Sequence, residues 1–104
     1  LSAIDWLENM PGVESWGIPE TIQLATLARE HGVDMIDVFS GGLVPAPISM
    51  GPGYQVPLAN AVRETADIPV VAVGELGDPL TAQQVLVDGL ADAIDVGRAA
   101  LFEP

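Results

Sequence analysis

The sequence predicts an α/β fold, specifically part of a (βα)8 TIM barrel with roughly its last four βα units. Short runs of branched apolar residues alternate with longer amphipathic stretches, as in parallel strands joined by helices. The pattern Asp-x-Ile-Asp-Val occurs at 34–38 and again at 92–96, each time after a glycine that is placed to end a helix, and repeated βα modules produce such recurrence. A small doubly wound sheet is the other candidate, but no Gly-x-Gly-x-x-Gly fingerprint supports it.

In the first half of the chain we expect a strand tail at 1–4, a helix that begins at Pro19, and a strand at 34–38. Proline is favoured in a first helical turn, and Glu20 suits the positive end of the helix dipole. Gly32 follows the helix as a left-handed terminating glycine. An irregular loop rich in glycine and proline then covers 43–54.

The second half continues the alternation. A helix is expected from Pro57 to about residue 66, and the nearly continuous apolar run at 68–73 is typical of a strand covered on both faces. Asp78 and Pro79 form an N-cap with proline at the first helical position, so a helix at 79–88 follows, and then a strand at 93–96 and a last helical turn from Gly97. We therefore expect the order β-α-β-α-β-α-β in a fragment of one domain, residues 1–104, with both ends cut inside a larger barrel.

Composition and charge exclude several classes of protein. The chain has 104 residues, 49% of them hydrophobic, which argues against a disordered tail. Fifteen Asp and Glu face three Arg and no Lys, for a formal charge of −12, so this acidic protein is not expected to bind nucleic acid or an anionic membrane surface. No apolar run approaches the roughly 18–20 residues of a membrane span, and no secretory signal is visible, so a cytoplasmic location is expected. The absence of cysteine excludes disulfides and thiolate metal sites.

The candidate site is a phosphate-binding site at Gly74, Gly97 and Arg98, and we expect no metal site. In βα barrels, the loops that follow the last two strands commonly form a phosphate site. Glycine lets the main chain approach a phosphate closely, exposed N–H groups at a helix start donate to it, and arginine adds a bidentate cation. Arg98 is one of only three cations. The alternative is structural, with Gly97 in a tight turn and Arg98 paired with a nearby carboxylate.

Several motifs resemble one family throughout the chain. Pro-Gly-Tyr-Gln-Val-Pro at 52–57 is the most distinctive, because packing alone gives little reason for this hexapeptide. The sequence is similar in register to the flavin-dependent old yellow enzymes (NADH:flavin oxidoreductases) of the bacterial ene-reductase branch. The similarity includes Leu-Ser-Ala-Ile-Asp-Trp at 1–6, the strand at 32–38 with Ser-Gly-Gly at 40–42, the strand at 68–74, Asp-Pro at 78–79 and Gly-Arg at 97–98.

The resemblance implies the C-terminal half of an FMN-binding (βα)8 barrel. NAD(P)H would reduce FMN, and the flavin would reduce the C=C bond of a small α,β-unsaturated carbonyl substrate. By analogy, Gly97 and Arg98 would hold the FMN phosphate, assisted by the main chain around Gly74. The family's substrate-binding histidines and donor tyrosine belong to the other half, so no catalytic residue is assigned here. Activity would then require the missing half.

Two other functions remain open. The chain could be a non-catalytic half-barrel that self-associates as a homo-oligomer through its open edges, with at most weak FMN or phosphate binding. It could also be part of another phosphate-binding barrel, in which the substrate carries the phosphate.

Four further residues attract attention. His31, the only histidine, is expected to lie in the last turn of a helix, where a cation interacts favourably with the negative end of the helix dipole. It is not expected to act in catalysis. Asp37 and Asp95 alternate with apolar neighbours and are expected to point into the barrel, where they could share a proton with raised pKa values. The preferred interpretation is that each pairs with an arginine or a backbone donor. Phe39 and Asp95 depart from the family's usual residues, which are a small side chain and an apolar one respectively.

Overall fold

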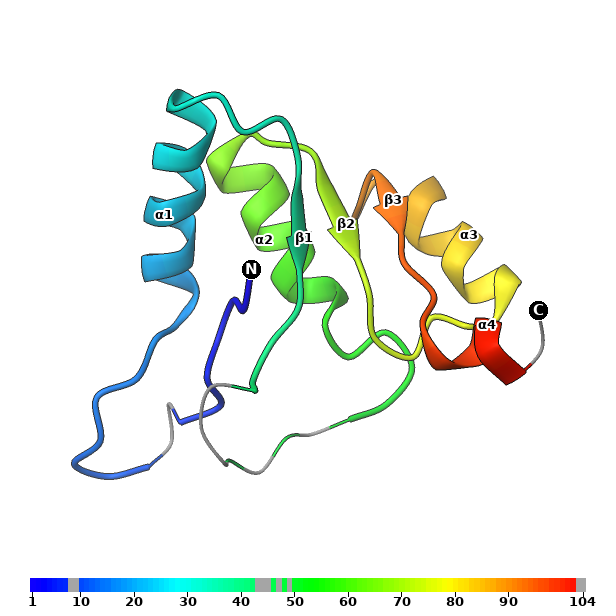
Figure 1. Cartoon of the computed structure of the whole chain (residues 1–104), viewed down its shortest axis with the longest axis horizontal. Coiled ribbons are helices and arrows are strands. Elements are labelled where there is room, and N and C mark those ends of the chain that lie inside the picture. The colour runs from blue at the N-terminus through cyan, green and yellow to red at the C-terminus, as the bar shows by residue number, and fades with distance from the viewer. Residues whose placement is uncertain (8–9, 43–45, 47, 49, 103–104) are drawn as a thin grey trace.

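The computed structural model describes residues 1–7, 10–42, 46, 48 and 50–102. Within these residues, four helices alternate with three short strands (Figure 1). In chain order the elements are α1 (Ile18–Glu30), β1 (Ile36–Val38), α2 (Val56–Ala66), β2 (Val70–Ala72), α3 (Pro79–Val87), β3 (Ala93–Ile94) and α4 (Arg98–Phe102). None of the helices in the described part of the chain has the length and apolarity that crossing a membrane requires.

The strands form one parallel sheet in the order β1-β2-β3. The N-terminal segment continues this order on the free side of β1. Ala3 N–H donates to Phe39 O at 2.8 Å, Phe39 N–H donates to Leu1 O at 3.1 Å, and Ser2 forms a parallel bridge with Phe39. The expected strand tail is thus present as bridge pairing rather than a regular strand. Neighbours in the sheet are consecutive in the sequence, as in an arc of a barrel wall.

The helices begin where their capping residues predict. Glu20 Oε2 accepts from Gly17 N–H at 3.2 Å in front of α1. Asp78 Oδ2 accepts from Thr81 N–H at 3.3 Å and from Thr81 Oγ–H at 2.8 Å, which caps α3. These bonds satisfy N–H groups that have no partner within the helix.

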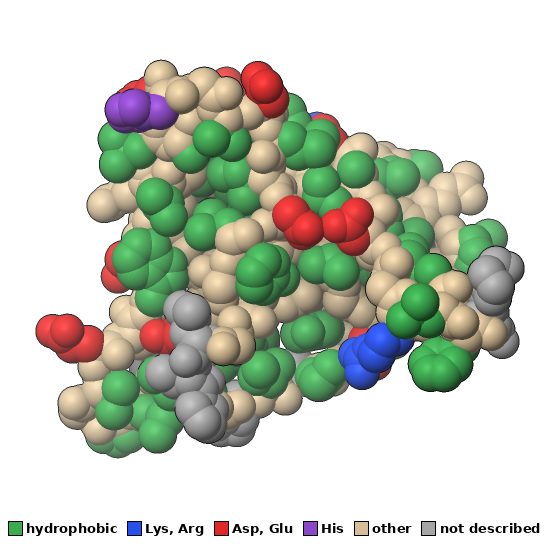
Figure 2. Space-filling model, in the orientation of Figure 1, with side chains coloured by type: hydrophobic (Ala, Val, Ile, Leu, Met, Phe, Trp, Pro, Cys, Tyr) green, Lys and Arg blue, Asp and Glu red, His purple; other side chains and the backbone are tan. Residues whose placement is uncertain are grey.

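One face of the sheet carries the core and the other is open. Ile36, Val38, Val70 and Ala72 are buried on the face that α2 covers, while Asp37 between them is exposed. In Figure 1 helix α2 passes behind the strands, and the face toward the viewer has no helix over it. Figure 2 shows hydrophobic side chains on that face, with two acidic groups side by side near its centre. In a closed barrel this face would line the interior.

A single arginine links α2 to the elements that follow it. Arg63 Nε donates to Asp92 Oδ2 at 3.0 Å, and Arg63 Nη1 donates to Gly89 O at 2.8 Å. The same Asp92 oxygen accepts from Val70 N–H at 2.9 Å. These bonds join α2, the start of β2 and the turn before β3. The Val70 N–H and, after it, the Arg63 guanidinium hold the pKa of Asp92 below its usual value.

Candidate anion-binding site

A pocket of about 580 Å³ lies where β2 and β3 end, within the range of volumes of small-molecule sites. Its walls come from the turn after β2, the turn after β3, both ends of α4 and Pro52. All three predicted site residues, Gly74, Gly97 and Arg98, line this pocket. The structure therefore brings together two turns that are more than twenty residues apart in the sequence.

The turn after β2 fits closely against the loop that precedes α2. Gly74 has φ +114°, a conformation that side-chain-bearing residues rarely adopt. An alanine Cβ at this position would lie 2.6 Å from Gln55 Nε2 and 2.8 Å from Tyr54 Cε1. The next residue, Glu75, has φ +50° although it is not glycine. Such backbone strain persists only where the surroundings hold it in place.

Gly97 is a glycine for a different reason. Its φ is not positive, and a Cβ there would meet no atom within 4 Å. Neither its main-chain conformation nor contacts within the described residues explain the absence of a side chain. The bare main chain borders the pocket, so a ligand can approach it closely.

Arg98 is the cation of this pocket. Among the described residues, the two ion pairs are Arg29 with Asp67 at 3.4 Å and Arg63 with Asp92 at 3.0 Å, and neither involves Arg98. The expected structural alternative, in which Arg98 pairs with a carboxylate, thus finds no support in that part of the chain. Two acidic residues, Glu75 and Asp95, also line the pocket.

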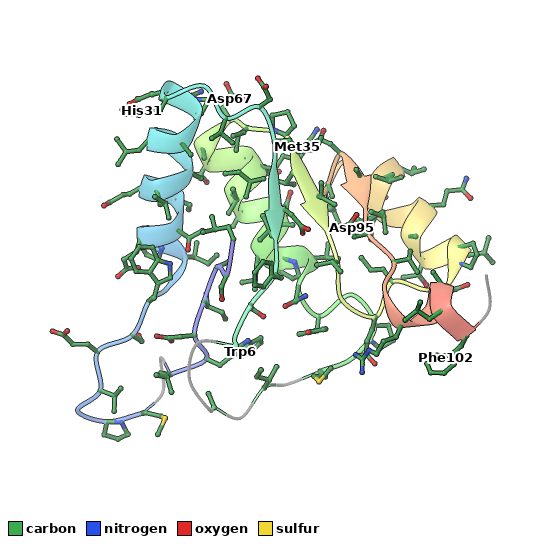
Figure 3. All side chains as sticks on the ribbon, viewed as in Figure 1. Trp6, His31, Met35, Asp67, Asp95 and Phe102 are labelled. Carbon is green, nitrogen blue, oxygen red and sulfur yellow. The ribbon has the colours of Figure 1, made fainter. Side chains whose placement is uncertain are left out.

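The two aspartates of the repeated motif face each other rather than an arginine. Burial, then a hydrogen bond and charge repulsion from Asp95, raise the pKa of the Asp37 carboxyl. Both residues are exposed on the open face of the sheet, and Figure 3 shows Asp95 on the chain that follows β3. The raised pKa expected for Asp37 is confirmed, and the contact between the two carboxyl groups that this alternative requires is present. The preferred pairing with arginine or a backbone donor is wrong for the described contacts, because neither ion pair involves these aspartates and no backbone N–H donates to their side chains.

A chain of side-chain hydrogen bonds beside the pocket was not predicted. Trp6 Nε1 donates to Ser40 Oγ at 2.9 Å, Ser40 Oγ donates to Gln55 Oε1 at 2.6 Å, and Gln55 Nε2 donates to Val73 O at 2.9 Å. The motifs at 40–42 and 52–57 mark the segments that carry Ser40 and Gln55. Their meeting depends on the tertiary fold, so sequence patterns alone do not reveal it.

His31 lies away from this site. It is the C-cap residue of α1, and its Nδ1 lies 2.8 Å from Leu27 O. Figure 3 shows His31 and Asp67 at one end of the sheet and Trp6 and Phe102 at the other. The expected structural place at a helix end is confirmed. The described residues contain no cluster of three or more potential metal ligands.

Comparison with known proteins finds relatives but no matching family model. The chain is similar to NADPH dehydrogenases from Halalkalibacterium halodurans (44% identical over 87 residues), Bacillus subtilis (45% over 87 residues) and Geobacillus sp. WCH70 (41% over 91 residues). These matches cover 84%, 84% and 88% of this chain but only 26%, 26% and 27% of the relatives. The chain thus spans about a quarter of the length of the curated relatives it matches. It is homologous to one part of the NADPH dehydrogenases, and it belongs with them to the old yellow enzyme family that its motifs resemble.

Proposed function

We propose that this chain supplies the phosphate-binding part of an FMN site in an NADPH-dependent oxidoreductase that reduces the activated C=C bond of α,β-unsaturated carbonyl compounds. In this proposal residues 1–104 form the C-terminal half of an FMN-binding (βα)8 barrel, with the remaining βα units supplied by residues outside the chain. The observation that carries it is the convergence of Gly74, Gly97 and Arg98 on one pocket at the carboxyl ends of the strands. In barrels of this class, ligand sites lie at that end.

The residues present fit a phosphate group. The open space at Gly97 leaves room at the main chain, and the Arg98 guanidinium can donate two parallel hydrogen bonds to phosphate oxygens. Bound FMN would supply the hydride chemistry after reduction by NADPH. The role of these residues is to bind and orient the phosphate end.

Direct contact, rather than a long-range field, must hold the anion. The chain has a formal charge of −12, and Glu75 and Asp95 line the pocket beside Arg98. An approaching dianion is therefore repelled until it reaches hydrogen-bonding distance of the guanidinium. This arrangement makes affinity depend strongly on Arg98.

FMN titration followed by flavin fluorescence tests the proposal. We expect Arg98→Ala to weaken binding by about 1.5–3 kcal/mol, the range for a hydrogen bond to a charged group. Arg29→Ala is the matched control, because it removes the same charge from the opposite end of the sheet, where Arg29 pairs with exposed Asp67. Equal affinities of Arg98→Ala and the unmodified protein would remove Arg98 from the site.

The open face of the sheet favours a second function, that of a non-catalytic half-barrel that self-associates. Met35 and Phe39, which alternate with Ile36 and Val38 as Asp37 does, are 46% and 40% exposed, although apolar side chains of this kind fill the interior of a complete barrel. A second copy could cover this face. Sedimentation velocity distinguishes the two functions, because this alternative requires a concentration-dependent dimer with little or no affinity for FMN.

A further inference from the structure

The buried side chain of Gln55 has no part in the function proposed above. Gln55 is 3% exposed, and its main-chain carbonyl accepts from Leu58 N–H at 3.1 Å and from Ala59 N–H at 3.2 Å, which begins α2. Its side chain makes no capping bond to that helix. The amide instead leaves the helix, and both of its ends form hydrogen bonds with other segments. A buried amide is tolerated when its polar atoms are satisfied in this way.

The groups at the two ends fix the direction of these hydrogen bonds. The Val73 carbonyl oxygen can only accept, so it faces the amide nitrogen of Gln55, which donates to it at 2.9 Å. The amide oxygen is left facing Ser40, whose hydroxyl donates to it at 2.6 Å. The Trp6 indole N–H can only donate, and Ser40 Oγ accepts from it at 2.9 Å. A neutral amide thus satisfies both neighbours at once.

These hydrogen bonds link the carboxyl ends of three neighbouring segments of the sheet. Trp6 follows the N-terminal segment, Ser40 follows β1, and Val73 follows β2. Gln55 is the member that contacts the turn of the pocket, since it both bonds to Val73 and occupies the space over Gly74. The turn carries two successive residues with positive φ, Gly74 and Glu75, so its conformation needs support from outside.

We propose that Gln55 is a positioning residue that holds the 73–75 turn in the conformation that presents the Gly74 main chain to the phosphate of the bound ligand. Gln55 does not line the pocket, so its effect passes through the turn rather than through contact. The proposal rests on the proposed function, because it assigns the phosphate end of FMN to this pocket.

Two substitutions remove the amide without adding a charge beside the pocket. Gln55→Leu and Gln55→Met each remove both hydrogen bonds of the side chain. The unbranched methionine is the closer match to glutamine in shape and adapts to a buried site. Gln83→Leu is the matched control, because Gln83 is an exposed glutamine on α3 outside the pocket. If Gln55→Leu fails to fold, Gln55→Met carries the test.

The readout is the ratio of the riboflavin Kd to the FMN Kd, which isolates the phosphate contribution. Loss of a hydrogen bond of this kind corresponds to roughly a tenfold change, so we expect the ratio to fall about tenfold in both Gln55 variants and to stay unchanged in Gln83→Leu. A substitution that merely destabilised the fold would weaken the binding of riboflavin and of FMN equally, and the ratio of the two Kd values would not change.

The outcomes separate the two proposals. If the unmodified protein prefers FMN and the Gln55 variants keep that preference, the positioning role is overturned while the proposed function stands. If the unmodified protein shows no preference for FMN over riboflavin, the proposed function fails, and the role assigned to Gln55 toward a phosphate fails with it.

Discussion

At the scale of single residues, the glycines of the pocket differ in what they require. Gly74 is fixed by positive φ and by contact with Gln55, whereas Gly97 has neither constraint. Gly77 is packed against α4, since a Cβ there would lie 2.5 Å from the Ala99 Cβ. The three glycines are therefore required for three different physical reasons, and only Gly97 indicates space that is kept open for a ligand.

Gly97→Ala should separate ligand binding from folding. We expect the thermal midpoint to stay the same or rise slightly, because the new Cβ meets open space and the unfolded chain loses entropy. FMN affinity should fall, because the methyl group enters the space beside the main chain. Gly77→Ala is the contrasting variant and should lower the midpoint. A stable Gly97→Ala protein with unaltered FMN affinity would contradict a ligand contact at this turn.

Asp37→Asn should stabilise the protein near neutral pH. Burial and the neighbouring Asp95 raise the pKa of Asp37 in the folded state, so ionisation of this group opposes folding as pH rises through that pKa. The gain in the free energy of unfolding should vanish below the pKa of an unperturbed aspartate, about 3.9, because the carboxyl is then neutral in folded and unfolded chains alike. Urea unfolding at several pH values measures this, with Glu14→Gln as an exposed control that removes one charge. A gain that grew toward acid pH would contradict the sign.

How much of the site was predictable differs residue by residue. That Gly74, Gly97 and Arg98 meet at one pocket was predictable, because the turns that carry them follow apolar strands directly and parallel strands end at the same edge of a sheet. Asp37 was placed on the inner face by its alternation with Ile36 and Val38. Its contact with Asp95 was named as one alternative but was not preferred over an arginine or backbone partner, since the pairing depends on how far β1 and β3 are offset in register.

At the scale of elements, helix starts were predicted better than strand ends. Capping bonds are local, so Asp78 followed by Pro79 specifies where α3 begins from sequence alone. Strand length depends on the neighbouring strand. The apolar run at 68–73 gives a regular strand of only three residues, Val70–Ala72, because β1 pairs with those three alone.

Arg63 supplies a test of how the elements are held together. We expect Arg63→Leu to lower the free energy of unfolding by about 1–2 kcal/mol, because it removes hydrogen bonds to Asp92 and to Gly89 O and leaves the latter with one partner fewer. Arg29→Leu breaks one ion pair with an Asp67 side chain that is 93% exposed, so its cost should be at most about 0.5 kcal/mol. Chemical unfolding compares the two variants. Equal losses would show that the links from Arg63 to β2 and β3 add nothing beyond a surface ion pair.

At the scale of the whole molecule, charge and the open sheet face act against each other. Exposed Met35 and Phe39 favour covering this face. Asp37 and Asp95 lie on the same face, so two copies packed face to face would bring four carboxylates together away from water, at a large electrostatic cost. Self-association through this face therefore requires that the carboxylates be protonated or removed.

The double substitution Asp37→Asn, Asp95→Asn should accordingly promote self-association at neutral pH. The unmodified protein should associate more as pH falls, because covering the face raises the pKa of Asp37 further, whereas the double variant should lose most of that pH dependence. The control Glu14→Gln, Glu30→Gln removes two charges from exposed positions elsewhere and should remain like the unmodified protein. Sedimentation velocity at pH 7 and pH 5 measures the dimer fraction. If both double variants associate equally, reduced net charge is the cause rather than this face, and the self-associating half-barrel loses its structural basis.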